Sequence, residues 1–204
     1  MRLWTIQKID AYEQFKKTKI LRGNEKYVWE DFLPAYKWMI EQMKVRINEP
    51  IPEPNAYPVW AWYQWQDEKK TKPDLRYSGH LSSGEKGVRI EFEIDEKKVL
   101  LSDFELYHFV LNYWYISLNE KDDDLFDEEM EKHNLTILDL QDFSKKSKIL
   151  DYFRNRAEKS WERIFDLDWY EEYVNHPKNL KSIQAVFWEL HWDQVIDVKE
   201  FKAR

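Results

Sequence analysis

The sequence predicts an α+β domain, and three observations lead to that class. Apolar and polar residues alternate in short stretches of the first half, as expected for strands, and the stretches 183–190 and 195–201 are also expected to form two closing strands. Apolar residues at helical spacing fill most of the segments between them. Strand and helix do not alternate strictly, which favours a mainly antiparallel sheet over a doubly wound one. We therefore expect a single domain over residues 1–204, with strands from both chain ends and several packed helices.

The chain begins with an expected strand at 3–6, in which Trp4 and Ile6 share one face. A helix should follow, with Asp10 as its cap and Gly23 just beyond its end. A second helix should start near Pro34, because proline is tolerated in a first helical turn. Three prolines then exclude regular hydrogen-bonded structure from 48–55.

A ring-rich strand is expected at 59–65. Its two faces separate the side chains of Trp60 and Trp62 from those of Val59, Ala61, Tyr63 and Trp65. The polar segment 69–87 holds three of the four glycines and is the best candidate for a mobile loop. The clearest strand is 88–94, whose alternate apolar residues face the core while Glu91 and Glu93 face solvent.

In the second half, Ser102 or Asp103 should cap a helix that continues to Trp114. The acidic segment 120–131 is expected to form a solvated connection between helices, because runs of like charge usually stay in water. Residues 136–165 should be helical in two pieces.

Composition excludes several kinds of site. Without cysteine the chain has no disulfide, thiolate zinc site, iron–sulfur cluster or cysteine nucleophile. Its 4 glycines form neither a dinucleotide-binding motif nor a P-loop, and none of its 5 histidines stands in a helical zinc pair, so no metal site is predicted. The 11 Trp, 12 Tyr and 11 Phe residues indicate a folded domain with aromatic walls.

Few residues remain as candidates for chemistry. His108 lies in an expected helix and is a candidate general base, although a structural or partly exposed histidine is the commoner case. Glu91 and Glu93 have the spacing of a glycosidase-like carboxylate pair on one strand face, but a solvent-facing edge accounts for them better.

Tryptophans are the main candidates for binding. Trp4, Trp60, Trp62 and Trp188 could line a sheet cleft and stack on a nucleobase, sugar or nicotinamide ring, whereas the alternative is an aromatic core. A formal net charge of -7 makes nucleic acid an unlikely partner.

Several segments form a distinctive set along nearly the whole chain: 1–7 (MRLWTIQ), 35–39 (AYKWM) with 42–43 (QM), 58–62 (PVWAW), 99–104 (VLLSDF), 159–165 (KSWERIF) and 183–187 (IQAVF). Together they resemble a bacterial family known only as a domain of unknown function (family 3841). That family brings no established activity.

The chain is also similar to the ADP-ribosyltransferase-like folds, which often open with a basic residue on a short strand, then a helix and a glycine. Arg2, the helix at 10–20 and Gly23 follow that order. The resemblance implies NAD as the cofactor, with Arg2 at its diphosphate and Trp60 or Trp62 against the nicotinamide ring.

The same resemblance implies a glutamate on a late strand that stabilises a cationic sugar in the transition state. Glu189 would take that role. Gln184 is the other residue that could occupy the position, and a glutamine supplies no negative charge.

These observations lead to two hypotheses. In the first, the protein binds a nucleotide-like ligand; its enzymatic form would be an NAD-dependent ADP-ribosyl transfer, with Glu189 and His108 as catalytic residues and Arg2, Trp4, Trp60 and Trp62 as cofactor-binding residues. In the second, it is a non-catalytic recognition or structural module whose acidic segment meets a protein partner. The sequence shows neither a signal peptide nor an apolar stretch that could span a bilayer, so we expect a cytoplasmic protein with no membrane contact.

Overall fold

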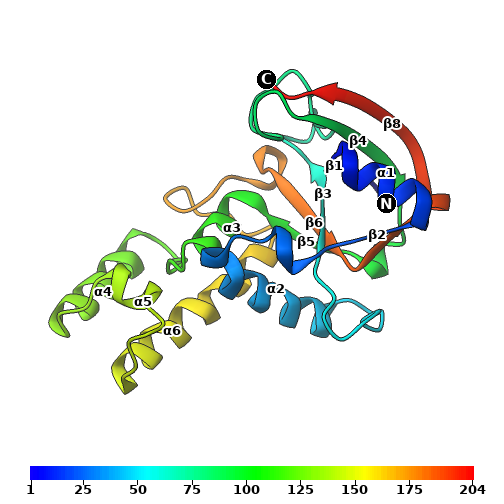
Figure 1. Cartoon of the computed structure of the whole chain (residues 1–204). Helices are drawn as coiled ribbons and strands as arrows, with labels where there is room; N and C mark the ends of the chain where they lie inside the picture. Colours follow the sequence, from blue (N-terminus) through cyan, green and yellow to red (C-terminus); the bar gives the residue numbers. More distant parts are fainter. The chain divides into compact units, whose positions relative to one another are not determined.

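The computed structural model describes all residues, 1–204, and confirms the α+β class. Six strands form a main sheet in the order β5-β6-β3-β1-β4-β8, and two more form a small sheet, β2-β7. In chain order the strands are β1 (Arg2–Lys8), β2 (Ile20–Arg22), β3 (Val59–Gln64), β4 (Lys86–Glu93), β5 (Leu100–Asp103), β6 (Ile183–Phe187), β7 (Glu189–His191) and β8 (Val195–Lys202). Figure 1 shows β4 and β8 as long, curved neighbours, although they come from opposite halves of the chain.

Six α-helices accompany the strands. They are α1 (Ile9–Thr18), α2 (Leu33–Arg46), α3 (Phe104–Leu111), α4 (Glu120–Lys132), α5 (Ile137–Gln141) and α6 (Lys148–Ser160). The pairings of β1 with β3 and β4, of β3 with β6 and of β4 with β8 are antiparallel, as expected.

The chain divides into two compact units. The first contains Met1–Leu101 with Ile183–Arg204, and the second contains Ser102–Ser182. That the chain forms one domain stays a prediction.

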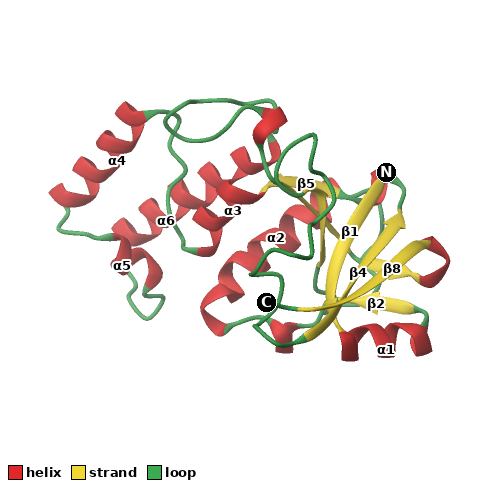
Figure 2. Cartoon of the chain, turned by 90° about the horizontal axis from the view of Figure 1, so that it is seen from above, coloured by secondary structure: helices red, strands yellow, loops and turns green.

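The core of the first unit lies on one face of the main sheet. Leu3, Ile90 and their alternate neighbours along the strands point to this face. Phe15 of α1 and Leu21 and Leu190 of the small sheet belong to the same cluster. Figure 2 shows α1 next to β2 along one side of the strands. Because successive side chains of a strand point to opposite faces, the other face of the main sheet carries the tryptophans and charged residues of these strands.

The first helix differs in detail from the expectation. Asp10 lies in the first turn of α1 and is not its cap. The helix ends where Lys19 adopts a left-handed conformation (φ 65°) and its N–H donates to the Phe15 carbonyl. Gly23 serves a close approach between backbones instead: a Cβ there would lie 2.4 Å from the carbonyl oxygen of Pro58.

Strand β3 contains an irregularity that the sequence does not predict. Its pairing with β6 shifts register between Trp62 and Gln64, as at a β-bulge. Gln64 is consequently buried and Tyr63 exposed. The expectation that Tyr63 shares one strand face with Ala61 is therefore wrong, whereas the apolar residues of 88–94 are all buried as predicted.

The second unit is mainly helical. Asp103 caps α3 by accepting hydrogen bonds from the N–H groups of Glu105 (3.0 Å) and Leu106 (3.2 Å). The acidic segment is not a connection but the helix α4, whose N-cap is Asn119. Its apolar residues Phe126 and Met130 lie one turn apart and are buried, so packing on one side holds a helix whose other side is acidic.

A buried ion pair stabilises this unit. Lys181 and Asp103 have side chains that are 1% and 2% exposed, and their charged atoms lie 3.2 Å apart. The Lys181 ammonium also donates to the Trp169 carbonyl at 2.9 Å. Each charge is thus compensated where water is excluded.

We expect Lys181→Met to lower the free energy of unfolding by about 3–5 kcal/mol, because it leaves the Asp103 carboxylate buried without its counter-charge. Lys178→Met, which breaks the exposed pair with Asp168, should cost less than about 1 kcal/mol. Urea denaturation of both variants measures the difference, and equal losses would contradict a special role for the buried pair.

Candidate functional site on the main sheet

Strand register brings four side chains into one line across the main sheet. Trp4 of β1 is paired with Trp62 of β3 on one side and with Glu91 of β4 on the other. Trp62 is paired in turn with Gln184 of β6. We call these four residues the cross-strand row. They alternate with the core residues and therefore lie on the face opposite the apolar core.

Glu91 is the charged centre of the row. Its carboxylate accepts hydrogen bonds from Trp4 Nε1 (2.9 Å) and Lys72 Nζ (2.6 Å), and Arg2 Nη1 lies 3.3 Å away. The side chain is only 10% exposed, so the expectation that it faces solvent is wrong. The reason is the loop between β3 and β4, which brings Lys72 onto the strand.

The environment of Glu91 keeps it ionised. Burial acts to raise the pKa of its carboxyl group, because it disfavours the charged form. Hydrogen bonds from Lys72 and Trp4 and the charges of Lys72 and Arg2 outweigh that effect, so the pKa lies below its ordinary value. With three partners, this carboxylate positions the cations around it and is not a free base.

The loop is fastened to the sheet at a second point. Arg89 of β4 donates from Nη1 to the Pro73 carbonyl at 2.6 Å, beside the contact made by Lys72. Farther along, the ring of His80 packs on Trp65 with centroids 5.6 Å apart. The segment 69–87, expected to be a mobile loop, therefore lies in part against β4. No sequence pattern distinguished Lys72 from the neighbouring lysines as a residue of the site.

The accessible groups of the site are two cations, a ring and an amide. The side chains of Arg2 and Lys72 are 53% and 41% exposed, so both can donate to a further anion while they contact Glu91. Trp62 and Gln184 are each partly exposed. This combination suits a ligand that carries both a negatively charged group and a flat ring.

Two of the tryptophans predicted to line a binding cleft, Trp60 and Trp188, are packed against other residues. Trp60 is on the same face as Trp62, but its ring contacts Tyr36 of α2 edge-on, with centroids 5.8 Å apart. Trp188 is fully buried. Trp188 therefore belongs to the core, and Trp60 lies where α2 meets the sheet.

Glu189 lies elsewhere. It is on β7, where Oε1 accepts from Arg22 Nε at 2.5 Å and Oε2 lies 3.2 Å from His191 Nε2. Its neighbour Leu190 packs in the apolar core on the other side of the main sheet. Arg2 and Glu189 are thus on opposite sides of that sheet, each with its own partners, and the structure does not bring them together.

The remaining predicted catalytic residue, His108, is exposed on α3 in the second unit. Its Nδ1 lies 3.0 Å from the Phe104 carbonyl oxygen, and its ring packs edge-on against the Phe104 ring. These contacts fix it on its own helix. Of the two residues considered for the late-strand position, Gln184 is the one that lies in the cross-strand row.

No group of three or more His, Cys, Asp or Glu side chains in the structure could hold a metal ion. No helix has the length and apolar character needed to cross a membrane.

The fold and this site define an α+β domain with a tryptophan- and cation-bearing sheet face. The chain belongs to the family described as Domain of unknown function (DUF3841), whose model matches residues 2–196. This confirms the first resemblance noted in the sequence. Neither a curated protein nor a solved structure matches the chain. The similarity to ADP-ribosyltransferase-like folds stays a prediction.

At neutral pH, Glu91→Gln should lower the free energy of unfolding by about 1–3 kcal/mol, because hydrogen bonds to charged groups are lost. Since the folded-state pKa of Glu91 is lowered, its contribution is complete above the pKa of the unfolded carboxyl and disappears as the pH falls through the folded-state pKa. The gap between wild type and variant should therefore shrink under acid conditions.

Denaturant titrations over a pH series measure that gap. Glu93→Gln is the matched control, because Glu93 lies on the same strand face with a side chain that is mostly exposed. Glu93→Gln should lower the free energy of unfolding by less than about 1 kcal/mol. A gap for Glu91→Gln that does not change with pH would contradict the assignment.

Proposed function

We propose that the sheet face around the cross-strand row binds a nucleotide-like ligand. The observation that carries the proposal is the convergence of two partly exposed cations, Arg2 and Lys72, on Glu91 next to the partly exposed ring of Trp62. An anionic group and a flat ring on one ligand match these two features.

In this proposal the ligand's phosphate groups bind Arg2 and Lys72. The guanidinium group offers a planar fork of donors to phosphate oxygens, and the ammonium acts as a second point charge. Glu91 holds both cations at the row through its own contacts. The scarcity of glycine fits this mode, since backbone phosphate loops are absent and side chains must provide the charge.

The ring of the ligand stacks on Trp62, and the Gln184 side chain supplies an amide donor and acceptor at its edge. Base–aromatic stacking contributes about 1–3 kcal/mol per ring. A nicotinamide or adenine ring would be accommodated by the same contact, because every such base has a flat π-face.

The transferase form of the proposal names NAD as this ligand and requires a carboxylate at the ribose. The contacts of Glu189 with Arg22 and His191, and those of His108 with its own helix, give that form no support. Glu91 is engaged by three donors and Gln184 is neutral. We therefore propose the binding-only form, in which the sheet face binds the nucleotide-like ligand, and the experiment with NAD below tests it against the transferase form.

One observation favours the alternative of a protein-recognition module. Each exposed acidic residue of α4 lies three or four positions from another one, so together they form one face of the helix: Glu120, Asp124, Asp127, Glu128 and Glu131. Burial and three neighbouring carboxylates raise the pKa of Asp127, which reports the crowding of negative charge. Such a face would suit a basic protein partner.

We expect ADP-ribose to bind the full chain, and Arg2→Gln and Trp62→Ala each to weaken it by about tenfold or more, because each removes a charged contact or a stacked ring. Isothermal titration calorimetry measures the dissociation constants. Trp29→Ala is the matched control, since the Trp29 side chain is 73% exposed, stacks on Phe32 and lies outside the cross-strand row. Unchanged affinity in both site variants would exclude this face as the binding site.

NAD should bind with an affinity similar to that of ADP-ribose and remain intact, since no free carboxylate lies in the cross-strand row. Chromatography of the reaction mixture after long incubation detects any released nicotinamide. Release by the wild type that is lost in Arg2→Gln would contradict the binding-only form and favour the transferase.

A further inference from the structure

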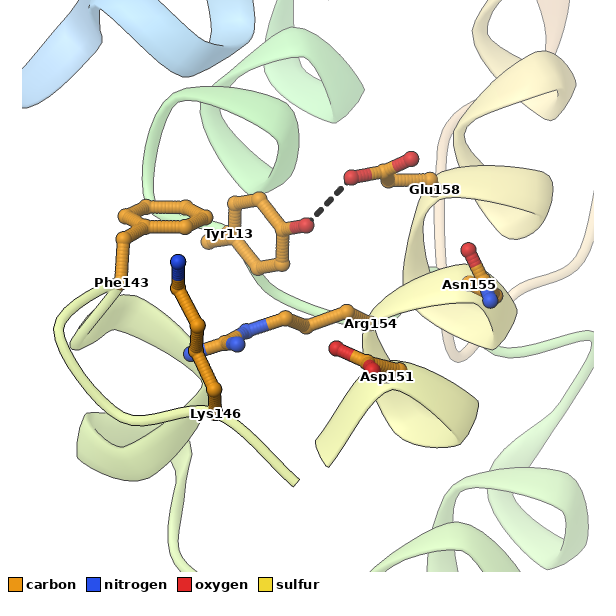
Figure 3. Close-up of a pocket in the computed structure, with 7 residues that line it drawn as sticks. All are labelled: Tyr113, Phe143, Lys146, Asp151, Arg154, Asn155 and Glu158. Atoms are coloured by element: carbon orange, nitrogen blue, oxygen red, sulfur yellow. Dashed lines mark hydrogen bonds between the residues drawn. The ribbon is translucent and has the colours of Figure 1, made fainter. Parts of the chain in front are cut away.

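The second unit contains a hollow that the proposed function does not use. Its volume is about 540 Å³. Figure 3 shows its wall on one side formed by one face of α6, and on the other by the segment that carries Phe143 and Lys146, with the ring of Tyr113 between them. All of these residues belong to the unit Ser102–Ser182.

A buried arginine holds the two walls together. The guanidinium of Arg154, on α6, donates to the backbone carbonyls of Leu140, Lys145, Asp139 and Asp142. These four bonds fix the loop after α5, so Phe143 and Lys146 are held opposite α6 before any ligand arrives. Pre-organisation of this kind lowers the entropic cost of binding.

Tyr113 occupies a conformation that glycine usually fills. It follows the end of α3 with φ 57°, while its N–H donates to the Val110 carbonyl and the next N–H, of Trp114, donates to the Phe109 carbonyl. This is the left-handed helix end at which glycine is preferred, because a side chain there is strained. The position is nevertheless occupied by a tyrosine, whose ring packs edge-on against the rings of Trp161 and Phe143, with centroids 4.8 Å and 5.1 Å away.

The Tyr113 hydroxyl donates to Glu158 Oε1. Burial first, and then that hydrogen bond and the charge of Glu158, raise the pKa of the phenol, so it stays protonated. Glu158 accepts this bond through one carboxyl oxygen and also lines the hollow. The strained backbone and this bond together set an aromatic and a negative group in fixed positions.

The charges across the hollow do not pair with each other. Lys146 reaches in from one side, and Asp151 and Asn155 lie on the α6 side with Glu158 one turn farther along (Figure 3). The side chains of Lys146, Asp151 and Asn155 make no hydrogen bond or ion pair within the chain. Two carboxylates thus face Lys146 across the hollow, and the second lining cation, Arg154, is already engaged by four backbone carbonyls.

We propose that this hollow binds a small zwitterion of the amino acid or dipeptide class. Its carboxylate contacts Lys146, its ammonium contacts Asp151 and Glu158, and its side chain lies against the rings of Phe143 and Tyr113. A ligand with only a positive charge would meet Lys146 unfavourably, and one with only a negative charge would meet two carboxylates. A ligand with both charges satisfies both walls at once.

Three probes that share one aromatic group test the proposal: phenylalanine carries both charges, phenethylamine only the ammonium and 3-phenylpropionate only the carboxylate. Titration calorimetry of the full chain should show phenylalanine binding at least about tenfold more tightly than either of the others, since each charged contact is worth about that factor or more. No binding of phenylalanine at millimolar concentration would overturn the proposal, as would equal affinity for phenethylamine or 3-phenylpropionate.

Two variants then locate the contacts. Lys146→Gln should weaken phenylalanine and 3-phenylpropionate but not phenethylamine, whose unfavourable contact with the Lys146 charge is removed. Asp151→Asn should weaken phenylalanine and phenethylamine but not 3-phenylpropionate, which no longer meets the Asp151 charge. Lys132→Gln, an exposed lysine on α4 away from the hollow lining, is the control and should change none of them. Both substituted side chains are exposed, so folding should be retained. Equal weakening of all three probes, or none, would overturn the assignment of this site.

Discussion

The interior position of β1 in the main sheet is the constraint on which the first unit depends. This strand pairs with β3 on one side and β4 on the other, so its seven residues fix the faces of both neighbours. Leu3 and Thr5 are buried on one face, while Arg2 and Trp4 take the other. A slip of one residue would exchange the two sets, placing a charged guanidinium in the core and leucine at the site. The large cost of that exchange explains why one register is specified so strongly.

Glu91 shows how the sheet accommodates a charge beside its core. Removing a carboxylate from water is unfavourable, and here a tryptophan N–H, a lysine and an arginine compensate for it. None of these partners belongs to β4: Trp4 and Arg2 are on β1, and Lys72 is in the loop between β3 and β4. The same contacts that stabilise the carboxylate therefore attach the β3–β4 loop to the sheet and hold two cations at its surface, so stability and the proposed binding function share one interaction.

The second unit relies on buried charge in a different way. Asp103 ends β5, caps α3 and is paired with Lys181, while Arg154 satisfies four carbonyls at the end of α5 and in the loop after it. Short helices leave many terminal carbonyls and N–H groups without partners inside the helix. Charged side chains that reach these groups hold α5 and its loop in place where a larger apolar core would otherwise be needed.

Much of the secondary structure of this protein can be predicted from local sequence. Alternation indicated β1 and β4, and helical spacing indicated α1, α2 and α6. Asp103 was one of two residues expected to cap α3. Each of these signals depends on residues a few positions apart. The local signals failed where tertiary packing outweighed them: the acidic segment became a helix because Phe126 and Met130 are buried, and Tyr63 turned outward at a bulge.

The candidate site could not be predicted from local sequence in the same way. Trp4, Trp62, Glu91 and Gln184 are far apart in the chain, and only strand pairing makes them neighbours. Lys72 carried no signal at all, because a lysine in a polar loop looks the same whether it meets water or a buried carboxylate. The sequence alone determined the class, the family and most elements; the tertiary structure decided which charges meet, because long-range pairing is set by the register of whole strands and not by any short motif.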